Sequence, residues 1–167
     1  MTQDERFMTE ALLLAAEAAA EGEVPIGCVV TLDDTIVGRG RNGRETGKNA
    51  LHHAEILAID EACRTLGGWR LPGCRLYVTL EPCPMCAGAI INARIPTVVY
   101  GARDPKAGSL SSVVNLFELP YNHKPQVISG VLEEQCGEIL RSFFRTLRQK
   151  KQQKPGAASP AETPQNH

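Results

Sequence analysis

The amino-acid sequence predicts an α/β domain, built as a three-layer α/β/α sandwich around a central mixed sheet. Segments with the apolar spacing of helices alternate along the chain with short segments rich in β-branched residues, an order typical of layered α/β domains. The chain has 167 residues, of which 43% are hydrophobic, enough for one domain with a real core. We therefore expect a single domain over residues 1–150 and a disordered tail over 151–167, where Pro and Ala are frequent.

The first half of the chain predicts two helices that flank a pair of strands. A capping box, Thr2-x-x-Glu5, opens the first helix, and Gly22 can end it. The turn Asp33-Asp34 joins the two strands. The elements expected here are a helix at 2–21, strands at 26–32 and 35–38, a loop at 40–49, and a helix at 53–66 with Ile56, Leu57, Ile59 and Ala62 facing inward.

The second half continues this alternation. Leu76, Val78 and Leu80 alternate as in a half-buried strand, and the last helix is amphipathic. The elements expected here are a strand at 74–80, a helix at 84–93, a strand at 97–100, a polar loop at 101–112, a strand at 127–129, and a helix from 131 to about 150.

Two short motifs, His53-Ala54-Glu55 and Pro82-Cys83-Pro84-Met85-Cys86, point to a metal site. One histidine and two cysteines offer three zinc ligands and leave the fourth tetrahedral position for water, which is typical of a catalytic site. The ligands expected are His53, Cys83 and Cys86. The neighbouring His52 could ligate instead, but only His53 has the H-x-E spacing that, with P-C-x-x-C, marks zinc-dependent nucleobase deaminases.

Both motifs fall at the predicted start of a helix. Helix N-termini stabilise anions, so thiolates of Cys83 and Cys86 are favoured there, and both can face one metal from a single turn. Two helices on the same face of the sheet would bring the motifs together near the strand ends. A bound zinc lowers the pKa of water from about 16 to about 7, and Glu55 can then move the protons of that water.

Each motif has a simpler interpretation when it is taken alone. A C-x-x-C pair is often a redox pair or half of a structural zinc site, and a histidine at a helix start is most often a surface or capping residue. The two motifs are 30 residues apart, and each lies at a strand-to-helix junction. Together they favour a catalytic zinc.

The other cysteines and the N-terminus indicate a reducing compartment. Residues 1–6 are polar and acidic, unlike a signal peptide, and no apolar run has the 18 residues of a membrane-spanning helix. We therefore expect a cytoplasmic protein without membrane association. Cys28 lies in the apolar run 26–30 and is expected to be a small buried residue, and the cysteines expected to be free thiols are Cys63, Cys74 and Cys136.

The net charge of −1 hides a basic segment near the C-terminus. Residues 141–154 contain six Lys and Arg side chains and no acidic residue, which leaves the rest of the chain acidic. Such a segment commonly contacts phosphates. A solubilising helix end would have the same composition, with its cations placed favourably in the helix dipole.

Longer strings carry a resemblance to a known family. These strings are Glu23-Val24-Pro25-Ile26-Gly27, Asn42, His53-Ala54-Glu55-Ile56, residues 79–89 (TLEPCPMCAGA), residues 101–108 (GARDPKAG), Asn122-His123 and Phe143-Phe144-Arg145. Over roughly residues 2–150 the chain resembles the cytidine deaminase-like superfamily, and within it the bacterial tRNA-specific adenosine deaminases. The resemblance implies the cytidine deaminase-like fold and one Zn²⁺ per subunit.

The resemblance also implies roles for residues outside the metal site. Asn42 and the Ala54 backbone N–H would bind the target base, although Asn42 could equally be a turn residue. The residues that would hold a splayed anticodon loop are Asp104, Lys106, Asn122, Phe144 and Arg145. Asp104 could instead cap a turn. Phe143 and Phe144 cannot share one helix face, and we favour Phe144 for the groove.

Two positions depart from the family pattern. His52 stands where the family usually has a small residue, next to the zinc histidine. The segment Ser109-Leu110-Ser111-Ser112 replaces a loop that we expect to be richer in Gly and Ala. Neither departure changes a ligand or Glu55.

The function expected is hydrolytic deamination of adenosine to inosine in tRNA, at wobble position 34 of the anticodon, by a homodimer in which both subunits contribute to the RNA site. The nearest alternative is deamination of a free base or nucleotide, such as guanine or a cytosine nucleotide, which needs neither the 101–108 loop nor the basic helix. A non-catalytic RNA-binding module with structural zinc is the third possibility, and it has no use for Glu55.

Overall fold

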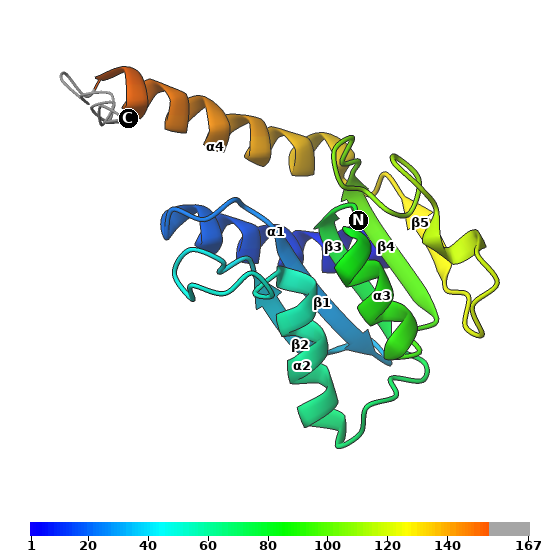
Figure 1. Ribbon diagram of the computed structural model, residues 1–167. Helices are drawn as coiled ribbons and strands as arrows, with labels where there is room; N and C mark the ends of the chain where they lie inside the picture. The colour runs from blue at the N-terminus through cyan, green and yellow to red at the C-terminus, as the bar shows by residue number, and fades with distance from the viewer. Residues whose placement is uncertain (154–167) are drawn as a thin grey trace, which may run out of the picture.

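The computed structural model describes residues 1–153 and has the predicted alternation of helices and strands (Figure 1). The helices are α1 (Gln3–Ala20), α2 (Ala54–Leu66), α3 (Pro84–Asn92) and α4 (Glu133–Gln153). The strands are β1 (Gly27–Leu32), β2 (Thr35–Arg41), β3 (Arg75–Leu80), β4 (Thr97–Ala102) and β5 (Gln126–Ser129). A short 3₁₀ helix, η1 (Leu116–Glu118), was not among the predicted elements.

Local sequence signals set the ends of these elements. The Thr2 hydroxyl accepts a hydrogen bond from the Glu5 N–H, and the Glu5 carboxylate accepts one from the Thr2 N–H, which confirms the capping box. Asp33 and Asp34 both have positive φ, as the tight turn between β1 and β2 requires. Helix α4 runs to Gln153, so residues 151–153 are helical. The rest of the predicted tail, residues 154–167, lies outside the described part of the chain.

The five strands form one mixed sheet in the order β2-β1-β3-β4-β5. Strand β1 is antiparallel to both of its neighbours, while β3, β4 and β5 are parallel. Helix α2 connects β2 to β3, and helix α3 connects β3 to β4. Because these three strands are parallel, both helices begin at the same end of the sheet. The carboxyl end of β3, where a binding site is expected in such folds, therefore lies beside the start of α3 (Figure 1).

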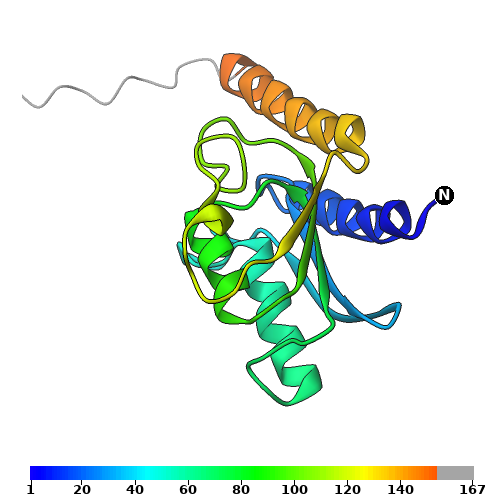
Figure 2. The same cartoon turned by 90° about the vertical axis from the view of Figure 1, so that its right-hand side faces the viewer.

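The helices cover both faces of the sheet and confirm the three-layer prediction. Helices α2 and α3 pack on one face, over a core that includes Val30, Leu76 and Val98. Helices α1 and α4 lie on the other face, over a second core that includes Phe7, Tyr77 and Cys136. Figure 2 shows the sheet nearly edge-on between α1 and the α2–α3 layer. Within residues 1–153, no helix combines the length and apolar character needed to cross a membrane.

The inward face of α2 differs from the prediction. The buried apolar residues of α2 are Ala54, Ala58 and Ala62, whereas Ile56, Leu57 and Ile59 are only partly buried. Ile59 nevertheless packs against the core, as expected, whereas Ile56 and Leu57 are not among the residues that pack against it, so the expectation was wrong for these two. The reason lies in β2, where Gly38 and Gly40 face the helix: a Cβ atom at either glycine would collide with the α2 backbone. Because the two glycines of β2 face the three buried alanines of α2, the helix lies close to the sheet.

This close contact predicts a large effect for one added methyl group. A Cβ atom at Gly38 would overlap the Ala58 carbonyl oxygen and lie 2.9 Å from the Ala62 nitrogen, both backbone atoms that cannot rotate away. We expect Gly38→Ala to lower the free energy of unfolding by about 1–3 kcal/mol, the usual cost of overpacking. Urea unfolding measures this. Gly68→Ala is the matched control, because no atom lies within 4 Å of its Cβ position and the unfolding midpoint should stay nearly unchanged.

Helix α4 is held to the sheet mainly near its start. Cys136 is its buried residue, and its thiol packs where a Cβ atom at Gly101 would otherwise stand. Beyond this contact the helix extends across the top of the domain, with Phe144 and Leu147 substantially exposed (Figure 1). Two cations of the basic segment, Arg141 and Arg145, pair with glutamates of α4 itself.

Candidate metal centre and active site

The starts of α2 and α3 bring the three predicted metal ligands together. His53 is the N-cap residue of α2, and Cys83 is the N-cap residue of α3. Neither side chain caps its own helix, so both are free to face the gap between the two helices. Pro84 at the first position of α3 fixes a helical backbone there and turns Cys86 inward, where it is fully buried.

The distances among these side chains fit one tetrahedral zinc ion. The His53 Nδ1 atom lies 3.5 Å from the Cys83 sulfur and 3.6 Å from the Cys86 sulfur, and all three ligand atoms lie within 4.8 Å of one another. Zn–S bonds of about 2.3 Å and a Zn–N bond of about 2.0 Å place tetrahedral nitrogen and sulfur ligands about 3.5 Å apart. The residues present therefore fit the metal, and His53 rather than His52 points to it.

The pKa values of the three ligand side chains also favour the binding of a cation. Hydrogen bonds from the Cys86 thiol and from His53 lower the pKa of the Cys83 thiol to about 4. The pKa of Cys86 is raised well above its usual value, because that thiol donates to Cys83 and is buried. The hydrogen bond to Cys83 raises the pKa of His53. A thiolate paired with two donors is a site that a divalent cation would occupy by displacing protons.

Glu55 is the second residue of α2, within its first turn, and it is only 4% exposed. Burial raises the pKa of its carboxyl, against the opposing effect of hydrogen bonds from its own backbone N–H and from the Cys86 thiol. A carboxyl with a raised pKa beside a metal triad is suited to taking up and releasing protons.

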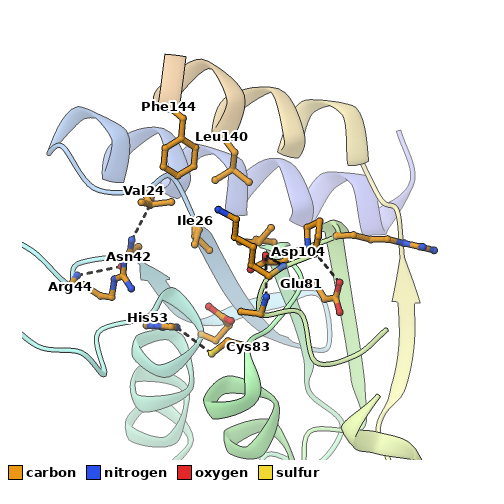
Figure 3. Close-up of a pocket in the computed structure, with 16 residues that line it drawn as sticks. Val24, Ile26, Asn42, Arg44, His53, Glu81, Cys83, Asp104, Leu140 and Phe144 are labelled. Atoms are coloured by element: carbon orange, nitrogen blue, oxygen red, sulfur yellow. Dashed lines mark hydrogen bonds between the residues drawn. The ribbon is translucent and has the colours of Figure 1, made fainter. Parts of the chain in front are cut away.

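A cavity of about 550 Å³ opens above the triad (Figure 3). Its size lies within the range of small-molecule sites. Leu140 and Phe144 point into it from α4, while Asn42 and Arg44 lie on the opposite side (Figure 3). The lining residues are Val24, Ile26, Asn42, Arg44, His53, Glu55, Leu80, Glu81, Cys83, Arg103, Asp104, Pro105, Lys106, Ala107, Leu140 and Phe144.

Most of the predicted substrate residues meet at this cavity. Asn42, Asp104, Lys106 and Phe144 line it, and Ala54 is buried between the ligand His53 and Glu55. Asn122 and Arg145 are exposed and are not among the lining residues. The sequence did not indicate Arg44, Arg103 and Leu140, since each needs the folded loops or α4 to reach the cavity.

The two turn interpretations also have a basis in the structure. The Asn42 side chain donates to the Val24 carbonyl and accepts from the Arg44 N–H, as in an Asx turn. The Asp104 carboxylate accepts from the N–H groups of Lys106 and Ala107. Both side chains line the cavity and keep further hydrogen-bonding capacity, because an amide or carboxylate has more donors or lone pairs than these contacts use.

Two buried carboxylates that sequence reasoning missed hold the loops around the cavity. Glu23 is 1% exposed and accepts from the backbone N–H groups of Glu45 and Thr46, in the loop that follows Asn42. Glu81 is 2% exposed and accepts from the loop that contains Asp104. Both residues lie in strings that the family resemblance contained, but nothing in those strings shows what a carboxylate contacts.

The fold and the ligand set define a zinc-dependent nucleobase deaminase. Residues 1–102 match the cytidine and deoxycytidylate deaminase zinc-binding region. A tRNA-specific adenosine deaminase of Bacillus subtilis (strain 168) is 55% identical over 152 residues, which cover 90% of this chain and 94% of that protein. One of Agrobacterium fabrum (strain C58 / ATCC 33970) is 48% identical over 89% of this chain and 98% of its own.

Solved structures agree with this assignment. A structure from a study of A-to-I editing by tRNA:A34 deaminases at the wobble position of transfer RNA is 48% identical, with a TM-score of 0.79, and covers 81% of this chain and 99% of that one. A guanine deaminase from Nitrosomonas europaea is 25% identical, with a TM-score of 0.69, over 83% of each chain. The chain belongs to the cytidine and deoxycytidylate deaminase family and, within it, to the tRNA-specific adenosine deaminases.

Proposed function

We propose that this protein hydrolyses adenosine to inosine in tRNA, at wobble position 34 of the anticodon, with release of ammonia. The observation that carries the proposal is the cavity itself: the metal ligands His53 and Cys83 and the buried Glu55 lie at its floor, and an aromatic side chain, Phe144, lines its roof. An unpaired base held on a strand of phosphates needs this combination of a reactive floor, a stacking surface and flanking cations.

The chemistry is divided between the metal and Glu55. A zinc ion held by His53, Cys83 and Cys86 would supply a Lewis acid that lowers the pKa of water to about 7. Glu55 takes a proton from the attacking water, which adds to C6 of adenine. The carboxyl delivers this proton to the ring nitrogen. It then takes the second proton from the hydroxyl now on C6 and delivers it to the departing amine as the C6–N bond breaks, so that water and adenosine become inosine and ammonia.

The base is oriented by the walls beside the triad. Asn42 is 3% exposed and is fixed by its contacts with Val24 and Arg44, so its remaining donor and acceptor are held toward the base. The Ala54 N–H is at the first position of α2, where helix N–H groups have no intrahelical partner, and it is available as a second donor.

The rim suits a splayed RNA loop. Arg44, Arg103 and Lys106 place three cations around the opening, and Asp104 adds a hydrogen-bond acceptor on the same loop as Lys106. Phe144 is 41% exposed, which leaves its ring available for base stacking. Arg145 and the basic end of α4 lie beyond the cavity, where they can contact flanking phosphates.

We extend the proposal to a homodimer formed in the cytoplasm. Asn122 does not line the cavity of its own chain, and it follows a stretch with exposed apolar side chains. These are Val113, Val114, Leu119 and Tyr121. A second copy that covers this stretch would bring Asn122 to the partner's RNA site. Sedimentation equilibrium tests this, and a monomer at micromolar concentration would contradict it.

The substrate assignment is tested by a panel of substrates given to the zinc-loaded protein. An anticodon stem-loop with adenosine at position 34 is compared with free adenosine, cytidine, deoxycytidylate and guanine, with products separated by chromatography. We expect inosine from the stem-loop alone. Turnover of a free compound, with the RNA unchanged, would keep the zinc chemistry and transfer the substrate to small-molecule metabolism.

A further inference from the structure

Glu81 makes an unusual set of contacts for a side chain that has no part in the chemistry above. One of its carboxylate oxygens accepts hydrogen bonds from three successive backbone N–H groups, those of Leu110, Ser111 and Ser112, at 2.9–3.1 Å. The other oxygen accepts from the Asp104 N–H at 3.2 Å and from the Ser112 hydroxyl. A single buried carboxylate therefore ties both ends of the segment 104–112 to one point.

The segment 104–112 also packs closely against this carboxylate. A Cβ atom at Gly108 would overlap the Glu81 carboxyl carbon and the Asp104 carbonyl oxygen, so only glycine permits the approach. The Ser109 N–H donates to the Pro82 carbonyl at 2.8 Å, next to Glu81 in the chain. The Ser111 hydroxyl, meanwhile, contacts the Tyr100 hydroxyl. The hydroxyls of all three serines that depart from the family pattern therefore have partners within the protein, since that of Ser109 donates to the Ala107 carbonyl, and the residues of this loop that line the cavity are 103–107.

The position of Glu81 in the chain gives these contacts a consequence for the site. Glu81 follows β3 and lies two residues before the ligand Cys83, so it belongs to the segment that carries the metal triad. Asp104 and Lys106, which line the cavity, belong to the segment that Glu81 holds. The carboxylate links the two parts directly, as Figure 3 shows for Glu81 and Asp104, and it makes five of the hydrogen bonds between them.

We propose that Glu81 is a positioning residue for substrate. It fixes the wall formed by residues 103–107 at a set distance from the metal triad, and so determines how well RNA is held rather than how fast protons move. This inference rests on the proposed function. It assigns to Glu81 an effect on KM, whereas residues that act on the proton or the metal act on kcat.

Glu81→Gln is the informative substitution because it keeps size and shape. The amide has one acceptor oxygen and one NH₂ donor group in place of two acceptors. Whichever way it turns, the NH₂ group faces donors: three backbone N–H groups in one orientation, or the Asp104 N–H and the Ser112 hydroxyl in the other. The segment must then move away from the β3–α3 connection.

Two measurements test the proposal. Hydrogen exchange, which needs no substrate, should become about tenfold faster or more at the amides of 104 and 110–112 in Glu81→Gln, as expected when bonds to a charged group are lost. With the position-34 stem-loop, KM should rise about tenfold while kcat stays within about threefold, and zinc content should not change. Glu61→Gln, an exposed position on α2, is the control and should match the wild type.

Ser112→Ala provides a milder variant that removes one hydroxyl contact and keeps the backbone. It should raise KM in the same direction by about threefold. Unchanged exchange at 104 and 110–112 in Glu81→Gln, or a fall in kcat together with zinc loss, would overturn the positioning role. Wild-type protein inert toward the RNA would instead defeat the proposed function, and the exchange result would still decide whether Glu81 holds the loop.

Discussion

Replacement of Glu55 by alanine should abolish deamination while bound zinc and RNA affinity stay close to wild type. Glu55 is not one of the three metal ligands, so its loss leaves the triad intact. Its buried carboxyl is the proposed proton carrier beside that triad, and positioned acid–base groups typically contribute about 10²–10⁴-fold to rate. We expect kcat to fall by about 10⁴-fold or more, the upper end of this range, because the same carboxyl serves more than one proton transfer. Single-turnover assays on the stem-loop measure the loss, and metal analysis measures the zinc.

Two variants make this result specific. Glu61→Ala removes an exposed carboxylate from the same helix and should retain wild-type kcat. Glu55→Gln keeps the shape of the side chain but cannot exchange protons in the same way, so it should be as inactive as the alanine variant. A non-catalytic RNA-binding module predicts wild-type behaviour for Glu55→Gln. Loss of zinc from Glu55→Ala would show that the role assigned to Glu55 is wrong.

The metal triad could be predicted from the sequence because its geometry is local. Cys83 and Cys86 are three residues apart at a helix start, so one turn of backbone fixes their relative position. His53 needed one more step, the expectation that two helices begin at the same end of a sheet. The alternation of helices and strands supplied that step, and the structure brings His53 within 3.6 Å of both sulfurs.

The packing of α2 could not be predicted in the same way. Periodicity identifies which residues share a helix face, but it favours the larger side chains as the inward ones. Here the opposing strand contributes Gly38 and Gly40, and the space they leave suits alanines alone. The decisive residues lie in another element, so helical spacing within 53–66 carries no sign of them.

The cavity wall shows a similar limit. The family resemblance predicted RNA contacts for Asp104 and Lys106, and both line the cavity. It predicted RNA contacts equally for Asn122 and Arg145, and neither of these residues lines the cavity. Glu81 was visible only as one letter of a string around the cysteines. Its contacts reach residues up to 31 positions away, and hydrogen bonds of that kind follow from the folded loop rather than from spacing.

Replacement of Cys86 by alanine should remove the zinc, stop turnover and destabilise the fold. Cys86 is fully buried between His53 and Cys83, and two remaining ligands cannot hold the ion tightly. A metal present at a thousandfold excess over its Kd stabilises the native state by about 4 kcal/mol. For a chain of this length we expect the Tm to fall by about 8–16 °C. Calorimetry and metal analysis on the same sample check both effects.

A matched variant separates metal loss from the loss of a buried thiol. Cys74→Ala also removes a fully buried sulfur, but at the opposite end of β3 and outside the triad, so it should keep zinc and activity and lose only the smaller packing contribution. Stripping zinc from the wild type with a chelator should lower its Tm toward that of Cys86→Ala, and it should leave the Tm of Cys86→Ala unchanged. If the chelator destabilises both proteins equally, Cys86 is not a ligand, because the variant would then still hold a metal to lose.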